Sequence, residues 1–235
     1  QYISNNIMTN GTVVFTIDRN NFENEIISKF GKELDMKNFY KKKKYIRFEN
    51  EEGIDYGGLK REFLELLSKS IKENSEEVNG YLLPKSKESD YWYVIGKIIL
   101  LCLLHNDKLS VNISPFIFDN ILNKNLNRTD LMKHYSMLNP KPFSFMEQSN
   151  EKNGDIIQMI TDSLITERKN TLNQIYNGFW GYLLPTNNIF KEYIKSLKCI
   201  DIYDYIIGNV NINVNDLKSK IASNNDKYRI WLINI

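Results

Sequence analysis

The longest apolar run in the chain, residues 91–104, constrains the fold more than any other segment and reads YWYVIGKIILLCLL. A helix that is apolar on all sides belongs in a protein interior. The run is about a turn or two shorter than the roughly 20 residues that cross a bilayer, and it contains Lys97. We therefore expect a buried helix and no membrane span. Ser89 or Asp90 would begin it, and residues 105–107 would end it.

The remaining apolar patterns predict a mainly α fold with small β elements (α+β), in one domain that covers residues 1–235. Alternating residues predict short strands near residues 12–18 and 45–48. Residues 74–90 are polar with little periodicity, so we expect a loop or a partly ordered excursion there. Apolar residues at helical spacing predict further helices near residues 22–30, 57–71, 115–121, 155–179, 188–197, 201–207 and 214–222.

Charge and cysteine content exclude several classes of function. The 31 basic and 29 acidic residues give a net charge of +2, which provides no overall attraction to nucleic acid or membrane. The two cysteines and two histidines form no metal-binding cluster, so we expect no metal and no cofactor. This cysteine usage fits a reducing compartment, cytoplasmic or nuclear. The chain begins with Gln1 and not with Met, which predicts a fragment or a processed chain.

The segment richest in glycine and acids, residues 48–63, reads FENEEGIDYGGLKREF. A phosphate-binding loop would need Lys and then Ser or Thr after its glycines, but Leu59 follows Gly58. A calcium loop would need oxygen ligands at alternate positions, and the acids do not keep that register. We interpret the glycines as structural. One would provide a positive φ angle, the pair would allow close backbone packing, and Asp55 would cap the following helix.

Few side chains qualify as nucleophiles or acid–base groups. Cys102 lies within the apolar run, where burial would raise its pKa. Cys199 lies near Lys195 and Lys198 but has no histidine nearby in the sequence. His105 follows the apolar run and is expected to cap that helix. The lysine run at residues 41–44 would either bind phosphate groups or form a solvated edge, and we favour the edge. No catalytic residue is predicted.

The stretch 48–63 closely resembles the signature of HECT-type ubiquitin-ligase domains. Ten residues match it without a gap, namely Phe48, Glu51, Glu52, Gly53, Asp55, Gly57, Gly58, Arg61, Glu62 and Phe63. Three later blocks, which begin YVIGKII, ERKNTLN and YIIGNVN, are similar to further parts of this family and keep its order from about residue 13 to 222. The resemblance implies the larger N-lobe of a HECT domain, a scaffold that binds a ubiquitin-charged conjugating enzyme.

Two departures from the family pattern bear on function. The C-lobe that carries the catalytic cysteine in this family is missing, and residues 223–235 would be the hinge or the start of that lobe. The conjugating-enzyme subdomain is reduced to residues 137–158. Within this remnant, Phe143, Phe145 and Met146 would either form an exposed patch for a partner or pack onto the core.

Two functions remain open at this point. The chain is either the N-lobe of a HECT ligase, with the ubiquitin-conjugating enzyme and ubiquitin as partners, or a degenerate HECT-like module that binds protein without transferring ubiquitin. In both cases we expect the chain itself to be catalytically inert. The protein substrate cannot be read from these residues.

Overall fold

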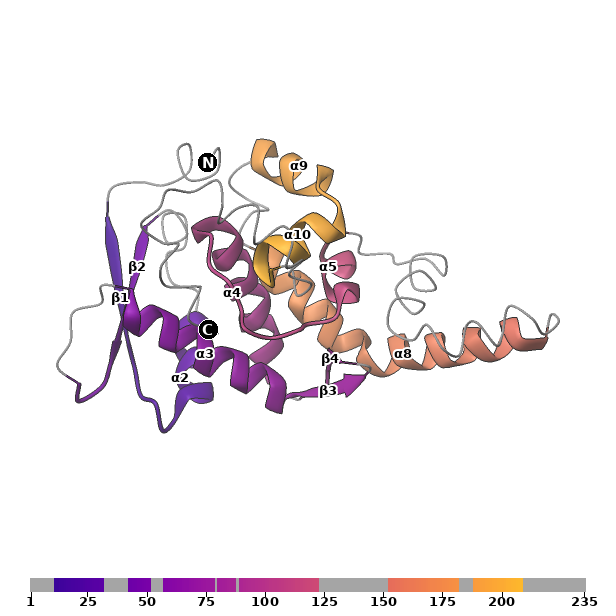
Figure 1. The fold of residues 1–235 in the computed structure, drawn as a ribbon, viewed down its shortest axis with the longest axis horizontal. Helices are drawn as coiled ribbons and strands as arrows, with labels where there is room; N and C mark the ends of the chain where they lie inside the picture. Colours follow the sequence, from indigo (N-terminus) through magenta and orange to yellow (C-terminus); the bar gives the residue numbers. More distant parts are fainter. Residues whose placement is uncertain are drawn as a thin grey trace, which may run out of the picture.

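The computed structural model describes residues 11–31, 42–51, 57–78, 80–87, 89–122, 152–181 and 188–208, with backbone alone for residues 78, 152–165 and 188–190. In this part of the chain helices predominate and two small two-stranded sheets accompany them, which confirms the predicted α+β class (Figure 1). None of the described helices is both long and apolar enough to span a bilayer.

A β-α-β unit opens the described chain. Strand β1 (Thr12–Ile17) leads into helix α2 (Phe22–Gly31), and strand β2 (Lys43–Phe48) returns parallel to β1, with Thr12 opposite Lys43 and Ile17 opposite Phe48. The alternation predicted for these strands is present, because Phe15 and Ile17 are buried whereas Val14 is exposed. Both strands and α2 lie at one end of the molecule (Figure 1).

The segment expected to be a loop or a partly ordered excursion, residues 74–90, instead contains a β-hairpin. Helix α3 (Gly58–Glu73) ends at Asn74, and strands β3 (Ser75–Val78) and β4 (Tyr81–Pro84) then pair antiparallel. The sequence between the two strands is Asn79-Gly80, the dipeptide most typical of two-residue hairpin turns, and Gly80 has a φ of 81°. The prediction was wrong because the short strands show little apolar alternation.

The apolar run forms the centre of the fold, as predicted. Helix α4 (Tyr91–His105) is buried along almost its whole length, and its most extensive contact is with α8 (Lys152–Trp180). Its end is also as expected, since Asn106 adopts a left-handed φ of 57°. After a short extended piece, in which Ile113 pairs with Leu82 of β4, helix α5 (Pro115–Leu122) packs against α8.

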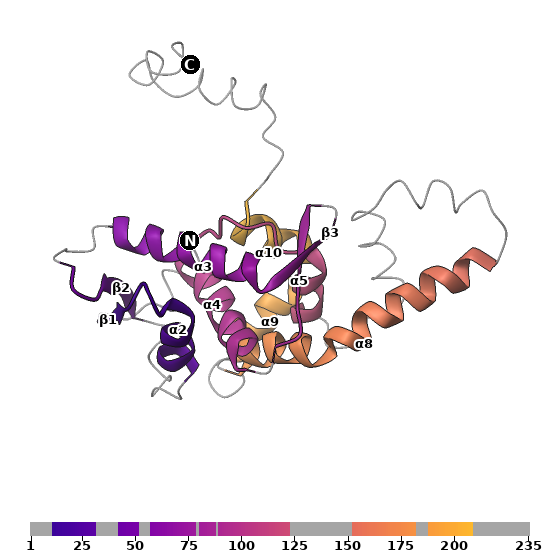
Figure 2. The same ribbon diagram turned by 90° about the horizontal axis from the view of Figure 1, so that it is seen from below.

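Helix α8 begins at Lys152, inside the segment 137–158 assigned to the shortened subdomain, and runs through residue 155, where the sequence predicted its start. Its N-terminal part extends away from the other described elements in both views (Figures 1 and 2). Two short helices follow, α9 (Asn188–Ser196) and α10 (Cys199–Ile206). Gly208 follows the C-cap residue Ile207 of α10 with a φ of 88°, the left-handed conformation in which helices commonly end.

Helices α4 and α8 approach each other through two glycines. A Cβ atom on Gly96 of α4 would lie 2.2 Å from the carbonyl oxygen of Ile175, and one on Gly178 of α8 would lie 1.9 Å from that of Tyr93. Only glycine allows two helix backbones to come this close. Packing of the core therefore requires positions without a side chain as well as buried apolar side chains.

Candidate functional site

The glycine-rich stretch connects the end of β2 to the start of α3. Gly57 occupies the N-cap position of α3 with a φ of 106° and a ψ of −16°, a conformation that side chains with a Cβ rarely adopt. This confirms that one glycine supplies a positive φ angle. The predicted cap Asp55 lies outside the described residues, and the N-cap position itself belongs to Gly57.

The second role predicted for these glycines is wrong. A Cβ atom on Gly57 or on Gly58 would meet no described atom within 4 Å, so the pair does not serve close backbone packing. The N-cap also has no side-chain hydrogen bond in the structure. Gly57 therefore acts through its backbone geometry, whereas Gly96 of α4 and Gly178 of α8 act through close packing.

Arg19, in the turn between β1 and α2, joins the two sides of the glycine-rich stretch. Its Nη2 atom donates to Glu51 Oε2 over 3.0 Å and to Glu62 Oε2 over 2.9 Å, and further bonds from the same guanidinium reach both carboxylates. The guanidinium carbon also lies 3.7 Å from the centroid of the Phe48 ring. Three residues of the motif thus converge on one arginine.

The electrostatics follow from this arrangement. Hydrogen bonds from Arg19 lower the pKa of Glu62 below its ordinary value, and the bonds to Glu62 and then to Glu51 raise the pKa of Arg19. The three side chains are about a third exposed, so water screens their attraction. Because both carboxylates already bind Arg19, the site is built to hold the two ends of a bend together.

The described residues contain no group of three or more His, Cys, Asp or Glu side chains that would hold a metal ion. The two acids of the motif that are described bind a cation of the protein itself. The observed geometry therefore agrees with a structural interpretation of the motif, in which Phe48 and Phe63 enter the core and the polar residues fasten the bend.

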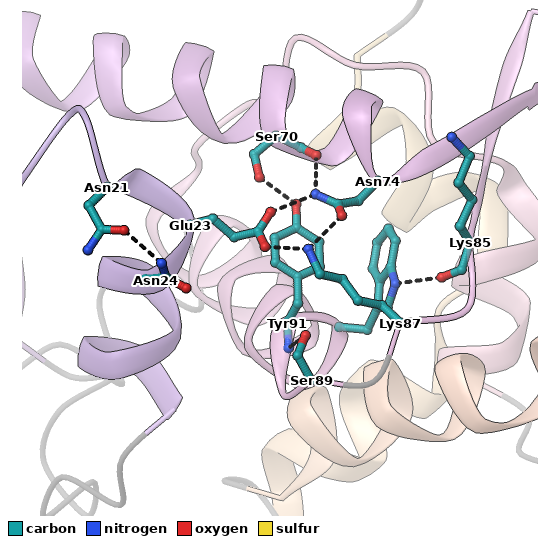
Figure 3. Close-up of polar contacts among 10 residues, drawn as sticks. Asn21, Glu23, Asn24, Ser70, Asn74, Lys85, Lys87, Ser89 and Tyr91 are labelled. Atoms are coloured by element: carbon teal, nitrogen blue, oxygen red, sulfur yellow. Dashed lines mark hydrogen bonds and ion pairs between the residues drawn. The ribbon is translucent and has the colours of Figure 1, made fainter.

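A second polar cluster joins α2, the end of α3 and the start of α4 (Figure 3). Asn74 Nδ2 donates to Glu23 Oε2 over 2.8 Å, Lys87 Nζ donates to Asn74 Oδ1 over 2.7 Å, and Lys87 also forms an ion pair with Glu23. In the same cluster, the Ser70 and Tyr91 hydroxyls lie 2.9 Å apart. Burial raises the pKa of Tyr91, so this phenol stays protonated and serves as a hydrogen-bonding group at neutral pH.

The two thiols occupy different environments. Cys102 is buried in α4, and burial raises its pKa, which confirms its assignment to the core. Cys199, at the start of α10, is half-buried and donates from Sγ to the Pro115 carbonyl oxygen over 3.1 Å. The Cys102 thiol therefore lacks the accessible setting that a nucleophilic cysteine requires.

His105 does not cap α4, because Asn106 holds the C-cap position. Its Nε2 atom instead lies 3.3 Å from Lys44 Nζ, at the rim of a small cavity between β2, α3 and α4. Sequence reasoning missed Lys44, which belongs to the lysine run. The signal was available, since Lys44, Ile46 and Phe48 alternate along β2 and all three face inward.

The predicted partner patch, Phe143, Phe145 and Met146, lies outside the described residues, as do residues 223–235. The structure therefore places none of these side chains relative to the core. Of the ten motif residues, Glu52, Gly53 and Asp55 also fall outside the described part.

Comparison with known proteins indicates a distant relation to ubiquitin ligases. The chain is 28% identical over 104 residues to a protein named E3 ubiquitin-protein ligase pub3, and 32% identical over 103 residues to one named probable E3 ubiquitin-protein ligase mug30, both from Schizosaccharomyces pombe. Each match covers 39% of this chain and 13% of the relative. No family model matches the chain.

These relatives establish a relation to E3 ubiquitin-protein ligases. The resemblance of residues 48–63 to the HECT signature does not depend on these relatives. Each match spans about an eighth of the length of the relative.

Proposed function

We propose that this chain is the N-lobe scaffold of a HECT-type ubiquitin-protein ligase, in which a cysteine of a C-lobe outside these residues transfers ubiquitin. The relation to two proteins named E3 ubiquitin-protein ligases carries this proposal. The HECT assignment is supported by the ten motif residues in one gap-free run. The lobe would bind a ubiquitin-charged conjugating enzyme and hold it in place, while the covalent step occurs on an accessible thiol elsewhere.

The described thiols support an inert role for the chain itself. Transfer through a thioester requires a thiolate that can attack the ubiquitin carbonyl and then release it. The Cys102 thiol is enclosed by α4 and its neighbours, and the Cys199 thiol donates a hydrogen bond to Pro115. We therefore assign neither cysteine to ubiquitin transfer.

Incubation with activating enzyme, a panel of conjugating enzymes and ubiquitin tests the proposal. We expect no ubiquitin thioester on Cys102 or Cys199, that is, no adduct that a reducing thiol removes. We also expect NMR titration to show measurable binding of at least one charged conjugating enzyme. A reducible ubiquitin thioester on Cys199 would overturn the inert scaffold. The Cys199→Ser variant is the control, because it keeps a hydrogen-bond donor to the Pro115 carbonyl and removes the nucleophilic sulfur.

The partner surface is tested separately. We assign conjugating-enzyme binding to Phe143, Phe145 and Met146, so replacing all three with Ala should weaken that binding at least tenfold. The matched control is Tyr193→Ala, which removes an apolar side chain of α9 that is 41% exposed. Equal losses in the two variants would contradict the assignment.

The alternative function is a degenerate HECT-like module that binds protein without taking part in transfer. The shortness of the segment 137–158, where the family resemblance implies a subdomain of some tens of residues, favours it. Failure to bind any charged conjugating enzyme would favour this module. In the parent protein, a Thr-Cys-aromatic sequence beyond Ile235 would favour the ligase.

A further inference from the structure

A small cavity lies between β1, α2, β2, α3 and α4. Its volume is about 40 Å³. This is room for about three waters, at roughly 10–15 Å³ for each, or for the tip of one branched aliphatic side chain. The walls are apolar and include Phe15, Phe30, Ile46, Phe63, Leu101 and Cys102. An apolar interior of this kind favours a hydrocarbon group over water.

Charged groups gather at the rim of this cavity. Lys44 is only 9% exposed, and its Nζ donates to the Lys42 carbonyl oxygen over 2.6 Å and lies 3.3 Å from His105 Nε2. On the other side, Lys60 Nζ pairs with Asp107 Oδ1 over 2.7 Å. With Lys42 close enough to act on Lys44, the described charged side chains here are three lysines and one aspartate, so the rim is positively charged.

The titration of Lys44 reflects this crowding. Burial, followed by the positive charges of Lys60 and Lys42, lowers the pKa of Lys44 to about 7. Burial also raises the pKa of Asp107, against the opposing effect of Lys60. An anion at the rim would oppose the unfavourable lysine–lysine repulsion and so favour the charged form of Lys44.

We propose that this cavity binds a carboxylate attached to a short branched aliphatic group. The carboxylate lies at the rim between Lys44, Lys60 and His105, and the aliphatic group enters the apolar interior. A free branched-chain acid and a peptide that ends in a residue such as leucine share this chemistry. The site is separate from the Arg19 cluster, because its described lining includes none of Arg19, Phe48, Glu51 and Glu62.

Three probes test the site in the whole chain by NMR titration at pH 6, namely isovalerate, N-acetyl-leucine and N-acetyl-leucinamide. Both acids should bind, and the amide, which lacks the negative charge, should bind at least tenfold more weakly than N-acetyl-leucine. Equal affinity of the two acids identifies the free acid as sufficient, whereas tighter binding of N-acetyl-leucine identifies a peptide terminus. Equal binding of the amide, or no binding of either acid, would overturn the proposal.

The pH dependence gives a second readout on the unaltered protein. The carboxylate needs a charged Lys44, so affinity should fall by about tenfold from pH 6 to pH 8 as that ammonium, with a pKa of about 7, loses its proton. The carboxylate of the ligand stays ionised throughout this range. An affinity that is constant or rises with pH would contradict a site built on Lys44.

The variant Lys44→Met keeps an apolar stem and removes the ammonium, and it should reduce affinity for N-acetyl-leucine at least tenfold at pH 6. Lys43→Met is the matched control, because Lys43 is exposed and its Nζ lies 5.1 Å from the ring centroid of Tyr45. Unchanged affinity in Lys44→Met would overturn the proposal. If this variant fails to fold, the three probes and the pH profile of the unaltered chain decide it.

Discussion

Two pairs of glycines have different structural roles in this molecule. Gly96 and Gly178 lie where α4 crosses α8, and a Cβ on either would collide with a backbone carbonyl of the facing helix. Gly57 and Gly58 lie at the start of α3, where a Cβ would meet no described atom within 4 Å. At Gly96 and Gly178 glycine is required because there is no space for a side chain. In the second pair only Gly57 is required, because its φ angle is positive.

The comparison also separates two kinds of motif. In the α4–α8 interface a Cβ on either glycine would lie against backbone atoms of the facing helix, so the interface has no space for an added atom. In the bend, polar side chains on the surface hold the chain, and Arg19 bridges Glu51 and Glu62. A packed interface resists any change in volume, whereas a surface bend resists mainly changes in backbone angle.

Gly178→Ala should have the largest effect. The new methyl group would lie 1.9 Å from the Tyr93 carbonyl oxygen, so α4 and α8 must separate. We expect a loss of about 3 kcal/mol in the free energy of unfolding, at the upper end of overpacking effects, and a similar loss for Gly96→Ala. Urea unfolding followed by circular dichroism measures both.

Gly58→Ala provides the matched control for these variants. Its Cβ would enter open space, its φ is not positive, and Ala favours a helix over Gly, so stability should rise by about 0.5–1 kcal/mol. If Gly178→Ala and Gly58→Ala changed stability equally, the distinction between volume and angle would be wrong.

Lys97→Met tests a buried charge where α4 packs against the end of α2. Lys97 lies beside Gly96, is 2% exposed, and donates from Nζ to the carbonyl oxygen of Phe30 over 2.9 Å. Met has a similar length without the donor, so a carbonyl at the end of α2 loses a charged hydrogen bond, and we expect a loss of about 2 kcal/mol. Unchanged stability would show that the desolvation cost of the ammonium cancels its hydrogen bonds.

Gly57→Ala tests the other region. The added methyl group has space, but a φ of 106° is strained for any residue with a Cβ, so stability should fall by about 1–2 kcal/mol. The effect should be smaller than that of Gly178→Ala, and hydrogen exchange should show it concentrated in the first turn of α3. A loss as large as that of Gly178→Ala would indicate a packing role for Gly57.

Much of this architecture was predictable, because it depends on local periodicity and on local backbone angles. The apolar run predicted α4, alternation predicted β1 and β2, and the glycine-rich stretch predicted one positive φ angle, which Gly57 supplies. The role of Gly58 was overestimated because a glycine pair in a sequence does not say which member the backbone needs.

The remainder depends on contacts between segments far apart in the chain. Nothing local to Gly96 or Gly178 indicates that they meet, since the requirement arises only when α4 crosses α8. Arg19 had no local signal for its bonds to Glu51 and Glu62, which are 32 and 43 residues away. The β3–β4 hairpin and the inward-facing Lys44, in contrast, have local signals in the sequence. The Asn79-Gly80 dipeptide indicates the hairpin turn, and the alternation along β2 indicates that Lys44 faces inward.

Arg19→Gln should have the smallest effect and the most distinctive pH dependence. The pKa of Glu62 is lowered in the folded protein, so its bond to Arg19 contributes stability above the unfolded pKa of about 4.3, and this contribution is lost as pH falls through the lower folded pKa. Since the side chains are about a third exposed, we expect a loss below about 1 kcal/mol at pH 7.

The sign of the pH dependence separates an electrostatic role of Arg19 from a packing role. The stability difference between the unaltered chain and Arg19→Gln, measured by urea unfolding, should be constant from pH 7 to pH 5 and shrink towards pH 3. Adding salt at pH 7 should also reduce it. A difference that persists at pH 3 would assign the effect to the stacking of Arg19 on Phe48, and the bend would then depend on burial much as the α4–α8 interface does.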